Sequence, residues 1–316
     1  MSIYDSSMIP KKMPRDGYLK DRLWLYLPFF GAVLIVCAVI LVLPYETVYV
    51  QDEAFLDMFL VTVSVCVAIF MFGTLYNILI WMLGKGLSGS AERRLVRVAW
   101  KSIKFFLSRR FGRAVSVFLK DGLYLSRLKE RSALRWLMHI LILGGFAIMF
   151  VLDLAVTVSL DFLKYEPMIQ DDGWAKLWLR DFGFDLVGAM MLVGLLIAAF
   201  RRFVVKPKIV RTELPDAASI LFLLAVVVGG FVLEGIGIAG NIQGHEIGDQ
   251  YSFMGYAFSL ITPDSLGAYY DEAWLIHGIM SALLIAYIPF SKLFHMIATP
   301  IAIEADRMLP QRGVAP

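Results

Sequence analysis

"AWLIHGIMSALLIAYIPFSKLFHMI", residues Ala273–Ile297, is a long apolar run that carries two of the four histidines in the chain. About 20 apolar residues are enough for a helix to cross the hydrocarbon core of a bilayer. Five further runs of this kind precede it. The six predicted spans are Leu23–Leu43, Met58–Leu83, Leu134–Val156, Phe184–Phe203, Ala217–Ala239 and Ala273–Ile297. The sequence therefore predicts an all-α fold, a polytopic membrane helical bundle with six transmembrane helices.

Composition and charge support this interpretation. The chain is 59% hydrophobic and only 18% charged, below the charged share of about 25% that is usual in soluble proteins. Residues 85–135 hold fourteen Lys and Arg against three acids, whereas residues 240–272 hold five acids and no Lys or Arg. Because basic loops stay in the cytoplasm, both termini are predicted to be cytoplasmic and residues 240–272 to face outward.

The basic segment 86–132 alternates basic and apolar residues at roughly helical spacing, which favours an amphipathic helix on the membrane surface. Contact with anionic lipid explains such a helix, and so does docking of a cytoplasmic partner protein. The two explanations are compatible, and neither involves nucleic acid.

The histidines of the last run are 18 residues apart, which is five whole helical turns and about 27 Å along a straight helix. His277 and His295 are therefore expected on one helix face, near the outer and the inner membrane surface. His139 follows Arg135 at the start of the third predicted span, at the same depth as His295. Two imidazoles that face each other across a helical bundle are typical axial ligands of a b-type haem.

Two glycines, Gly144 and Gly145, follow His139 by about a turn and a half, and they would let a flat macrocycle approach the backbone. On the outer side, His277 needs a second ligand for a haem. Met149 and His245 are the alternatives, and His277 could instead bind a quinone headgroup. A membrane histidine can also simply hydrogen-bond to a neighbouring helix.

Two carboxyl groups and two thiols in the predicted spans restrict the reactions that this chain could carry out by itself. Glu234 and Asp153 lie in the outer part of their spans, where a buried carboxyl could exchange protons with a quinone, or could merely reach the interface. Cys37 and Cys66 are the only cysteines, and both are expected to pack as small apolar residues. Two cysteines cannot hold an iron–sulfur cluster, so an iron–sulfur relay would require a partner subunit.

Several motifs resemble one known family. The stretches IPFSKLFHMIATP (288–300) and LMHILILGGF (137–146) are similar to the ligand-bearing helices of the gamma subunit of respiratory nitrate reductase. The stretches GFVLEGIGIAG (230–240) and YSFMGYAF (251–258) resemble the branch that partners iron–sulfur proteins like the catalytic (D) subunit of heterodisulfide reductase, as in transmembrane redox complexes of sulfate-reducing microbes.

The resemblance implies that His139 and His295 hold the inner haem and that His277 holds an outer one. The nitrate reductase subunit has a second histidine ten residues after the first, where this chain has Met149. The partner of His277 therefore stays open.

Together these features predict a cytochrome b subunit of a respiratory oxidoreductase complex in the cytoplasmic (inner) membrane of a prokaryote. Two b-type haems, or at least one, would carry electrons between menaquinone or another quinone and an iron–sulfur subunit. A periplasmic multihaem cytochrome c is a further candidate partner. The alternatives are a haem-free proton or solute transporter or channel subunit and a mono-haem quinone-binding anchor.

The same features divide the chain into three predicted parts. Residues 1–45 form a cytoplasmic N-terminus and an additional first span. Residues 46–300 form a five-helix haem-binding domain, and residues 301–316 a cytoplasmic tail.

Overall fold

The computed structural model describes most of the chain from residue 53 to residue 295. The described residues are 53–82, 118–170, 172–206, 214–242, 250–295 and 298–299, with short pieces between 31 and 41 and between 108 and 116. All regular structure in these residues is helical. The domain boundaries, most of the basic segment 86–132 and more than half of the predicted span Leu23–Leu43 lie outside the described residues and stay predictions.

Five helical segments among the described residues are long and apolar enough to cross a membrane. They are Glu53–Asn77, Ala133–Leu160, Lys176–Val205, Asp216–Ala239 and Asp264–Phe290. Each overlaps one of the predicted spans. The all-α membrane bundle predicted from the sequence is confirmed, and the protein is a multi-pass membrane protein.

Several of these spans combine α-helix with short π- or 3₁₀-helical turns. The α-helices are α2 (Glu53–Met82), α5 (Ser126–Arg131), α6 (Ala133–His139), α7 (Gly145–Thr157), α8 (Glu166–Ile169), α9 (Phe182–Ala199), α10 (Leu214–Ala239), α11 (Phe253–Ser259) and α12 (Tyr270–Tyr287). The π-helical turns are η3 (Phe118–Leu123), η4 (Ile140–Gly144), η5 (Val158–Phe162), η6 (Lys176–Asp181) and η7 (Phe200–Val205). The 3₁₀ turns are η8 (Asp264–Tyr269), η9 (Ile288–Phe290) and η10 (Lys292–Phe294).

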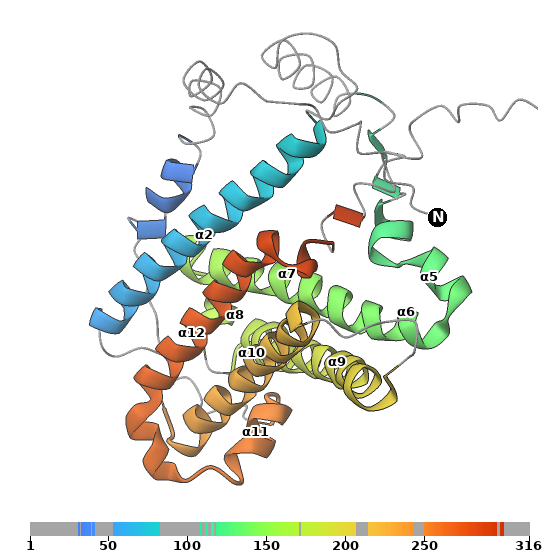
Figure 1. Ribbon diagram of the computed structural model, residues 1–316. Coiled ribbons are helices and arrows are strands. Elements are labelled where there is room, and N and C mark those ends of the chain that lie inside the picture. Colours follow the sequence, from blue (N-terminus) through green and yellow to red (C-terminus); the bar gives the residue numbers. More distant parts are fainter. Residues whose placement is uncertain are drawn as a thin grey trace, which may run out of the picture.

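Helix α9 is the most enclosed span, because α7, α10 and α11 all pack against it (Figure 1). Its buried residues Val187, Met191 and Leu195 recur every four positions, the spacing of one helix face. At Gly194 an added Cβ would lie 2.8 Å from Ile142 Cγ1. This close approach fixes α9 against the segment that follows His139.

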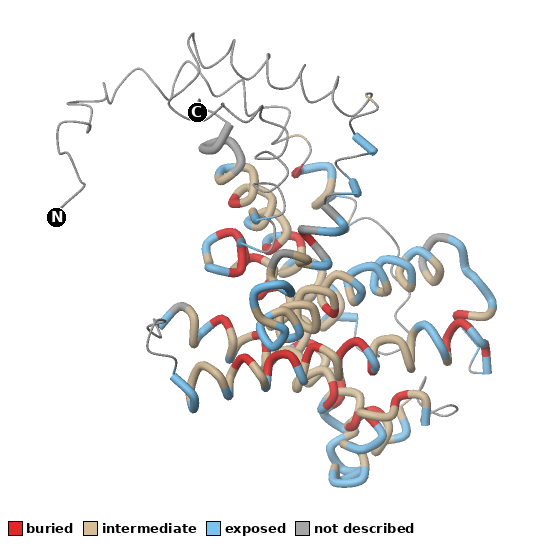
Figure 2. The backbone as a smooth tube through the Cα atoms, turned by 90° about the vertical axis from the view of Figure 1, so that its right-hand side faces the viewer, coloured by how far each residue is buried: buried red, intermediate tan, exposed pale blue. Residues whose placement is uncertain are grey.

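The outer faces of the spans are apolar and exposed. Figure 2 shows buried residues chiefly where helices cross, with exposed and intermediate residues along the rest of their length. Large side chains such as Phe150, Val151 and Leu196 are more than half exposed. Exposed apolar surface on this scale would be unfavourable in water, and it suits helices whose neighbours are lipid chains.

The last span ends differently from the sequence prediction. Helix α12 ends at Tyr287, and the chain continues through η9 and η10, with Ser291 extended between them at φ −113° and ψ 172°. Pro289 has no backbone N–H and its ring obstructs the preceding turn, so the regular α-helix is interrupted here. The expectation that His277 and His295 share one face of a straight helix is therefore wrong.

Helix α2 holds this break in place. The Asn77 side-chain amide donates a hydrogen bond of 2.8 Å to the Pro289 carbonyl oxygen. One turn earlier, an added Cβ at Gly73 would lie 2.6 Å from Pro289 Cβ. The absence of a side chain at Gly73 therefore allows α2 to approach the proline directly.

Replacing Gly73 by Ala tests this contact. The methyl group would force α2 and the Pro289 turn apart, and overpacking of this kind costs about 1–3 kcal/mol. The detergent-solubilised variant should unfold at a lower temperature than wild type. Gly112→Ala is the matched control, since an added Cβ there meets no atom within 4 Å. Equal unfolding temperatures for both variants would contradict the close contact.

Candidate functional site

His139 is the last residue of α6, and its ring is anchored by the backbone. Its Nδ1 lies 2.7 Å from the Arg135 carbonyl oxygen. A carbonyl can only accept a hydrogen bond, so Nδ1 must carry the proton and a neutral ring keeps its lone pair on Nε2. Anchoring of this kind is usual for imidazoles that ligate a metal.

The π-helical turn η4 begins directly after His139, at Ile140. Single π turns inside α-helices are frequent at functional sites. Gly145 packs against Met191 of α9, whereas Gly144 meets only Ile140 of its own helix. Gly145 thus serves helix packing, and the space beside Gly144 is open.

His295 follows the 3₁₀ turn η10 and is anchored in the same way. Its Nδ1 lies 2.5 Å from the Lys292 carbonyl oxygen, so its lone pair is also on Nε2. The turn is closed by Ser291, whose hydroxyl accepts a hydrogen bond of 3.1 Å from the Leu293 N–H.

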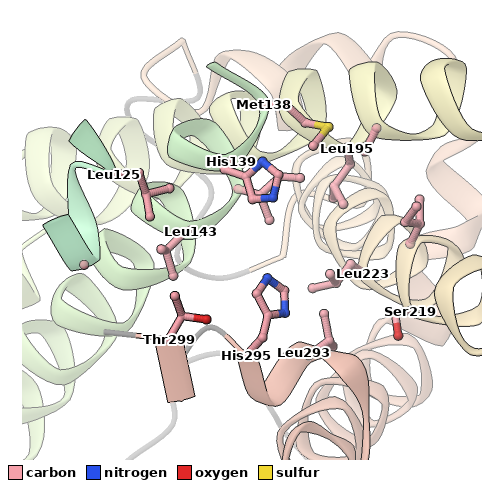
Figure 3. Close-up of a pocket in the computed structure, with 14 residues that line it drawn as sticks. Leu125, Met138, His139, Leu143, Leu195, Ser219, Leu223, Leu293, His295 and Thr299 are labelled. Atoms are coloured by element: carbon pink, nitrogen blue, oxygen red, sulfur yellow. The ribbon is translucent and has the colours of Figure 1, made fainter. Parts of the chain in front are cut away.

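The two imidazoles face each other across one cavity (Figure 3). The cavity has about 760 Å³ of empty space, including its open mouth. Its other lining residues are Gly122, Leu125, Met138, Ile142, Leu143, Leu195, Ala198, Ser219, Ile220, Leu223, Leu293 and Thr299. The walls are almost entirely apolar, so the two ring nitrogens are the main polar groups that a bound molecule would meet.

Charged groups lie near one end of this cavity. The guanidinium groups of Arg135 and Arg201 lie close enough to act electrostatically on His139. Asp216, in the first turn of α10, forms ion pairs with Arg202 and with Lys292, the latter at 2.9 Å. The apolar cavity therefore borders a largely basic rim.

His277 has different surroundings on α12. Its ring lies against α10, where an added Cβ at Gly229 would be 3.3 Å from its Nδ1 and one at Gly230 would be 3.4 Å from its Cε1. The Nδ1 atom is buried and has no hydrogen-bond partner among the described residues. His277 thus lacks the backbone anchor that His139 and His295 share.

Only one of the two alternative partners of His277 belongs to the described residues. Met149 packs at the α7–α9 contact, where an added Cβ at Gly188 would lie 3.9 Å from its Cε. His245 lies outside the described residues. Which of them completes an outer site stays a prediction.

Glu234 belongs to a buried carboxyl pair that the sequence did not predict. Its carboxyl group hydrogen-bonds to that of Asp185, and the Ser252 hydroxyl also hydrogen-bonds to Glu234. Asp185 is only 2% exposed and accepts a hydrogen bond of 2.5 Å from the Met254 N–H. Gly255 leaves room for the Glu234 side chain, which an added Cβ would strike. Two carboxyl groups that hydrogen-bond to each other must hold at least one proton between them.

Asp153, the other predicted proton-exchanging residue, is exposed on α7, and no contact among the described residues joins it to Glu234. Asp185 was missed because it stands at the predicted edge of its span, where an acid is expected to reach water. Lys176, also missed, is 1% exposed and pairs with Asp181 at 3.6 Å. Its position in an outer loop of the predicted topology gave no sign of burial.

Most residues of the candidate site lie in the part of the chain that matches one known protein family. The family model of the nitrate reductase gamma subunit matches residues 125–312. The chain belongs to the nitrate reductase gamma subunit family. The match includes α6 to α12 and all four histidines, and it begins after α2. The resemblance predicted from the sequence is confirmed.

Curated relatives place the chain near the heterodisulfide reductase members of this family. The E subunit of dihydromethanophenazine:CoB–CoM heterodisulfide reductase is similar, with 28% identity in Methanosarcina thermophila and 29% in Methanosarcina acetivorans, over 77% of this chain and 89% of each relative. An EtfAB:quinone oxidoreductase of Syntrophomonas wolfei is 22% identical over 74% of this chain and 31% of its own length. No solved structure matches. These relatives are redox proteins, and this chain is a membrane electron-transfer subunit.

Proposed function

We propose that this protein is a cytochrome b in which His139 and His295 are the axial ligands of an inner b-type haem. The observation that carries the proposal is the pair of imidazoles across one apolar cavity, each with Nδ1 anchored and Nε2 available. Bis-imidazole ligation between helices is a usual arrangement for such haems. Arg135 and Arg201 lie where they could pair with carboxylate groups of the cofactor.

The bound haem would supply reversible one-electron transfer. The chain's own residues fix two ligands at the cytoplasmic end of the bundle and exclude water from the cavity with apolar walls. Burial and charged neighbours are among the features by which a protein tunes a haem potential.

A second b-type haem on the outer side is the companion proposal, with His277 as one ligand and Met149 or His245 as the other. Gly229 and Gly230 support it, since they leave the face of α10 beside His277 free of side chains. The Nδ1 of His277 is buried and has no hydrogen-bond partner among the described residues, which leaves the ring able to bind a haem iron. If no second haem binds, His277 is instead proposed to contact a quinone.

The electron donor and acceptor are proposed from the chemistry of the chain and the names of its relatives. One relative is named for quinone and others for dihydromethanophenazine, so a membrane quinone such as menaquinone is the proposed mobile carrier. The chain has two cysteines, too few for an iron–sulfur cluster. The proposed cytoplasmic partner is therefore an iron–sulfur protein like the catalytic (D) subunit of heterodisulfide reductase, and a periplasmic multihaem cytochrome c is a further candidate.

The carboxyl pair is proposed to handle protons on the outer side. Oxidation of a quinol releases two protons with two electrons, and the electrons and protons must leave by different routes. Glu234 follows Gly230 by about one helical turn, so the pair is close to the region of His277 on α10. Asp185 takes the place that Asp153 was expected to fill.

Haem content of single variants is the direct test of the inner site. His139→Ala and His295→Ala should each abolish one b-type haem, measured as pyridine haemochrome per folded chain and in reduced-minus-oxidised spectra. Leu137→Ala is the matched control, since Leu137 is exposed on α6 and does not line the cavity. A folded wild-type protein without haem would refute the cytochrome proposal and favour a haem-free transporter.

His277→Ala tests the outer site separately. If His277 ligates a second haem, the variant should lose one haem and keep the spectrum of the haem that depends on His139. An unchanged haem content, with weaker binding of a quinone analogue, would assign His277 to a quinone site. An unchanged content with unchanged quinone binding would refute both roles.

Glu234→Gln tests proton handling. The amide keeps the size of the side chain and cannot accept a proton from a quinol, so haem reduction by a menaquinol analogue should slow by roughly 100-fold or more, the contribution usual for a positioned general base. Stopped-flow absorbance measures the rate. Asp153→Asn is the matched control and should reduce at the wild-type rate. Equal rates for Glu234→Gln and wild type would rule out this role.

A further inference from the structure

The two proposed inner ligands differ in how their anchoring carbonyls are held. Arg135 and His139 both belong to α6, so the carbonyl that orients His139 is fixed by a regular helix. Lys292 begins the short 3₁₀ turn η10, which follows an extended residue and a proline break, and His295 comes directly after this turn. A turn of three residues has poor hydrogen-bond geometry of its own. The orientation of His295 must therefore depend on contacts with other elements.

One such contact is an ion pair across the cytoplasmic end of the bundle. The Lys292 ammonium lies 2.9 Å from Asp216 Oδ1, and the other carboxylate oxygen of Asp216 pairs with Arg202. Asp216 belongs to the first turn of α10, and Arg202 belongs to η7 at the end of the α9 span. The pair thus ties the turn that carries His295 to two long membrane spans.

The surroundings of the Asp216 carboxylate favour this pairing. Asp216 and Arg202 are 16% and 17% exposed at their side chains, so water screens their pairing less than it would a surface pair. Asp216 also lies at the N-terminal end of α10, where the helix dipole favours a negative charge. Ser219, three residues further along α10, lines the cavity. The same end of α10 therefore borders the cavity and holds the turn.

We propose that Asp216 is a positioning residue for the inner haem: its carboxylate holds Lys292, and the Lys292 carbonyl in turn orients the His295 imidazole. The proposal rests on the proposed inner haem site. It makes the geometry of one axial ligand depend on an ion pair whose Lys292 side chain is 53% exposed on the cytoplasmic side. The other axial ligand, His139, has no such dependence.

Two variants separate positioning from simple charge. Asp216→Asn removes a negative charge near the haem, and Lys292→Met removes a positive one but keeps the backbone carbonyl. If charge alone matters, the two variants shift the midpoint potential of the haem in opposite directions. If the ion pair positions His295, both variants shift and broaden the low-spin EPR signal of the ferric inner haem in the same direction, because this signal reports the orientation of the axial imidazoles.

The experiment uses the full-length protein with its haem, purified from membranes. The inner-haem signal is the one that disappears in His139→Ala. We expect Asp216→Asn and Lys292→Met to alter that signal in the same way, and the double variant to add no further change. Asp216→Glu, which keeps the carboxylate, should retain the wild-type signal. Glu130→Gln is the matched control, since Glu130 is an exposed acid on α5 on the same cytoplasmic side.

The results that would refute the positioning role of Asp216 differ from those that would refute the inner haem. A wild-type protein without haem refutes the proposed function. A wild-type protein with the inner haem, combined with an unchanged EPR signal in both Asp216→Asn and Lys292→Met, refutes only the positioning role. Should Asp216→Asn fail to insert or fold, Lys292→Met decides alone, because its half-exposed side chain can be replaced with little effect on packing.

Discussion

A proline removes a helical hydrogen bond and obstructs the preceding turn, and at Pro289 this constraint decides the geometry of the end of the bundle that carries His139 and His295. Without the break, residues 288–295 would extend α12 along its own axis. With it, the chain turns through η9 and η10 and brings His295 to the cavity that His139 lines. The Pro289 carbonyl accepts a hydrogen bond from the Asn77 side chain. Irregular backbone is stable within a bilayer only when such partners exist.

The two imidazoles of the cavity have the same tautomer, but the backbone carbonyls that orient them are held in different ways. Both direct Nδ1 to a backbone carbonyl, which fixes the same tautomer. On α6 the carbonyl is part of a helix that would form in any case. At His295 the carbonyl belongs to a turn that needs Ser291, Asp216 and Asn77 to define it. The orientation of His139 is thus fixed within its own helix, and that of His295 depends on contacts with other elements.

This difference also explains what the sequence could and could not predict. Hydropathy located five of the predicted spans, with ends up to nine residues from those of the described helical segments. The equal depth expected for His139 and His295 followed from their flanking basic residues. The position of His295 on the helix did not follow, because the 18-residue spacing has this meaning only in a helix that continues through Pro289. Asp185 was missed for a related reason: its burial comes from Glu234 and the Met254 N–H, which are distant in the sequence. Hydrophobic periodicity describes a single helix, whereas the position of His295 and the burial of Asp185 depend on contacts between helices.

Helix α10 brings these features together along one axis. Asp216 holds the turn of His295 at the inner end, and Ser219 lines the cavity. Gly230 meets the ring of His277 eleven residues beyond Ser219, about 16 Å further along the helix. Glu234 meets Asp185 one turn later. A single helix therefore sets the spacing between the cavity, His277 and the carboxyl pair. In the proposed function, this spacing would place electron transfer and proton exchange at different depths of the bilayer.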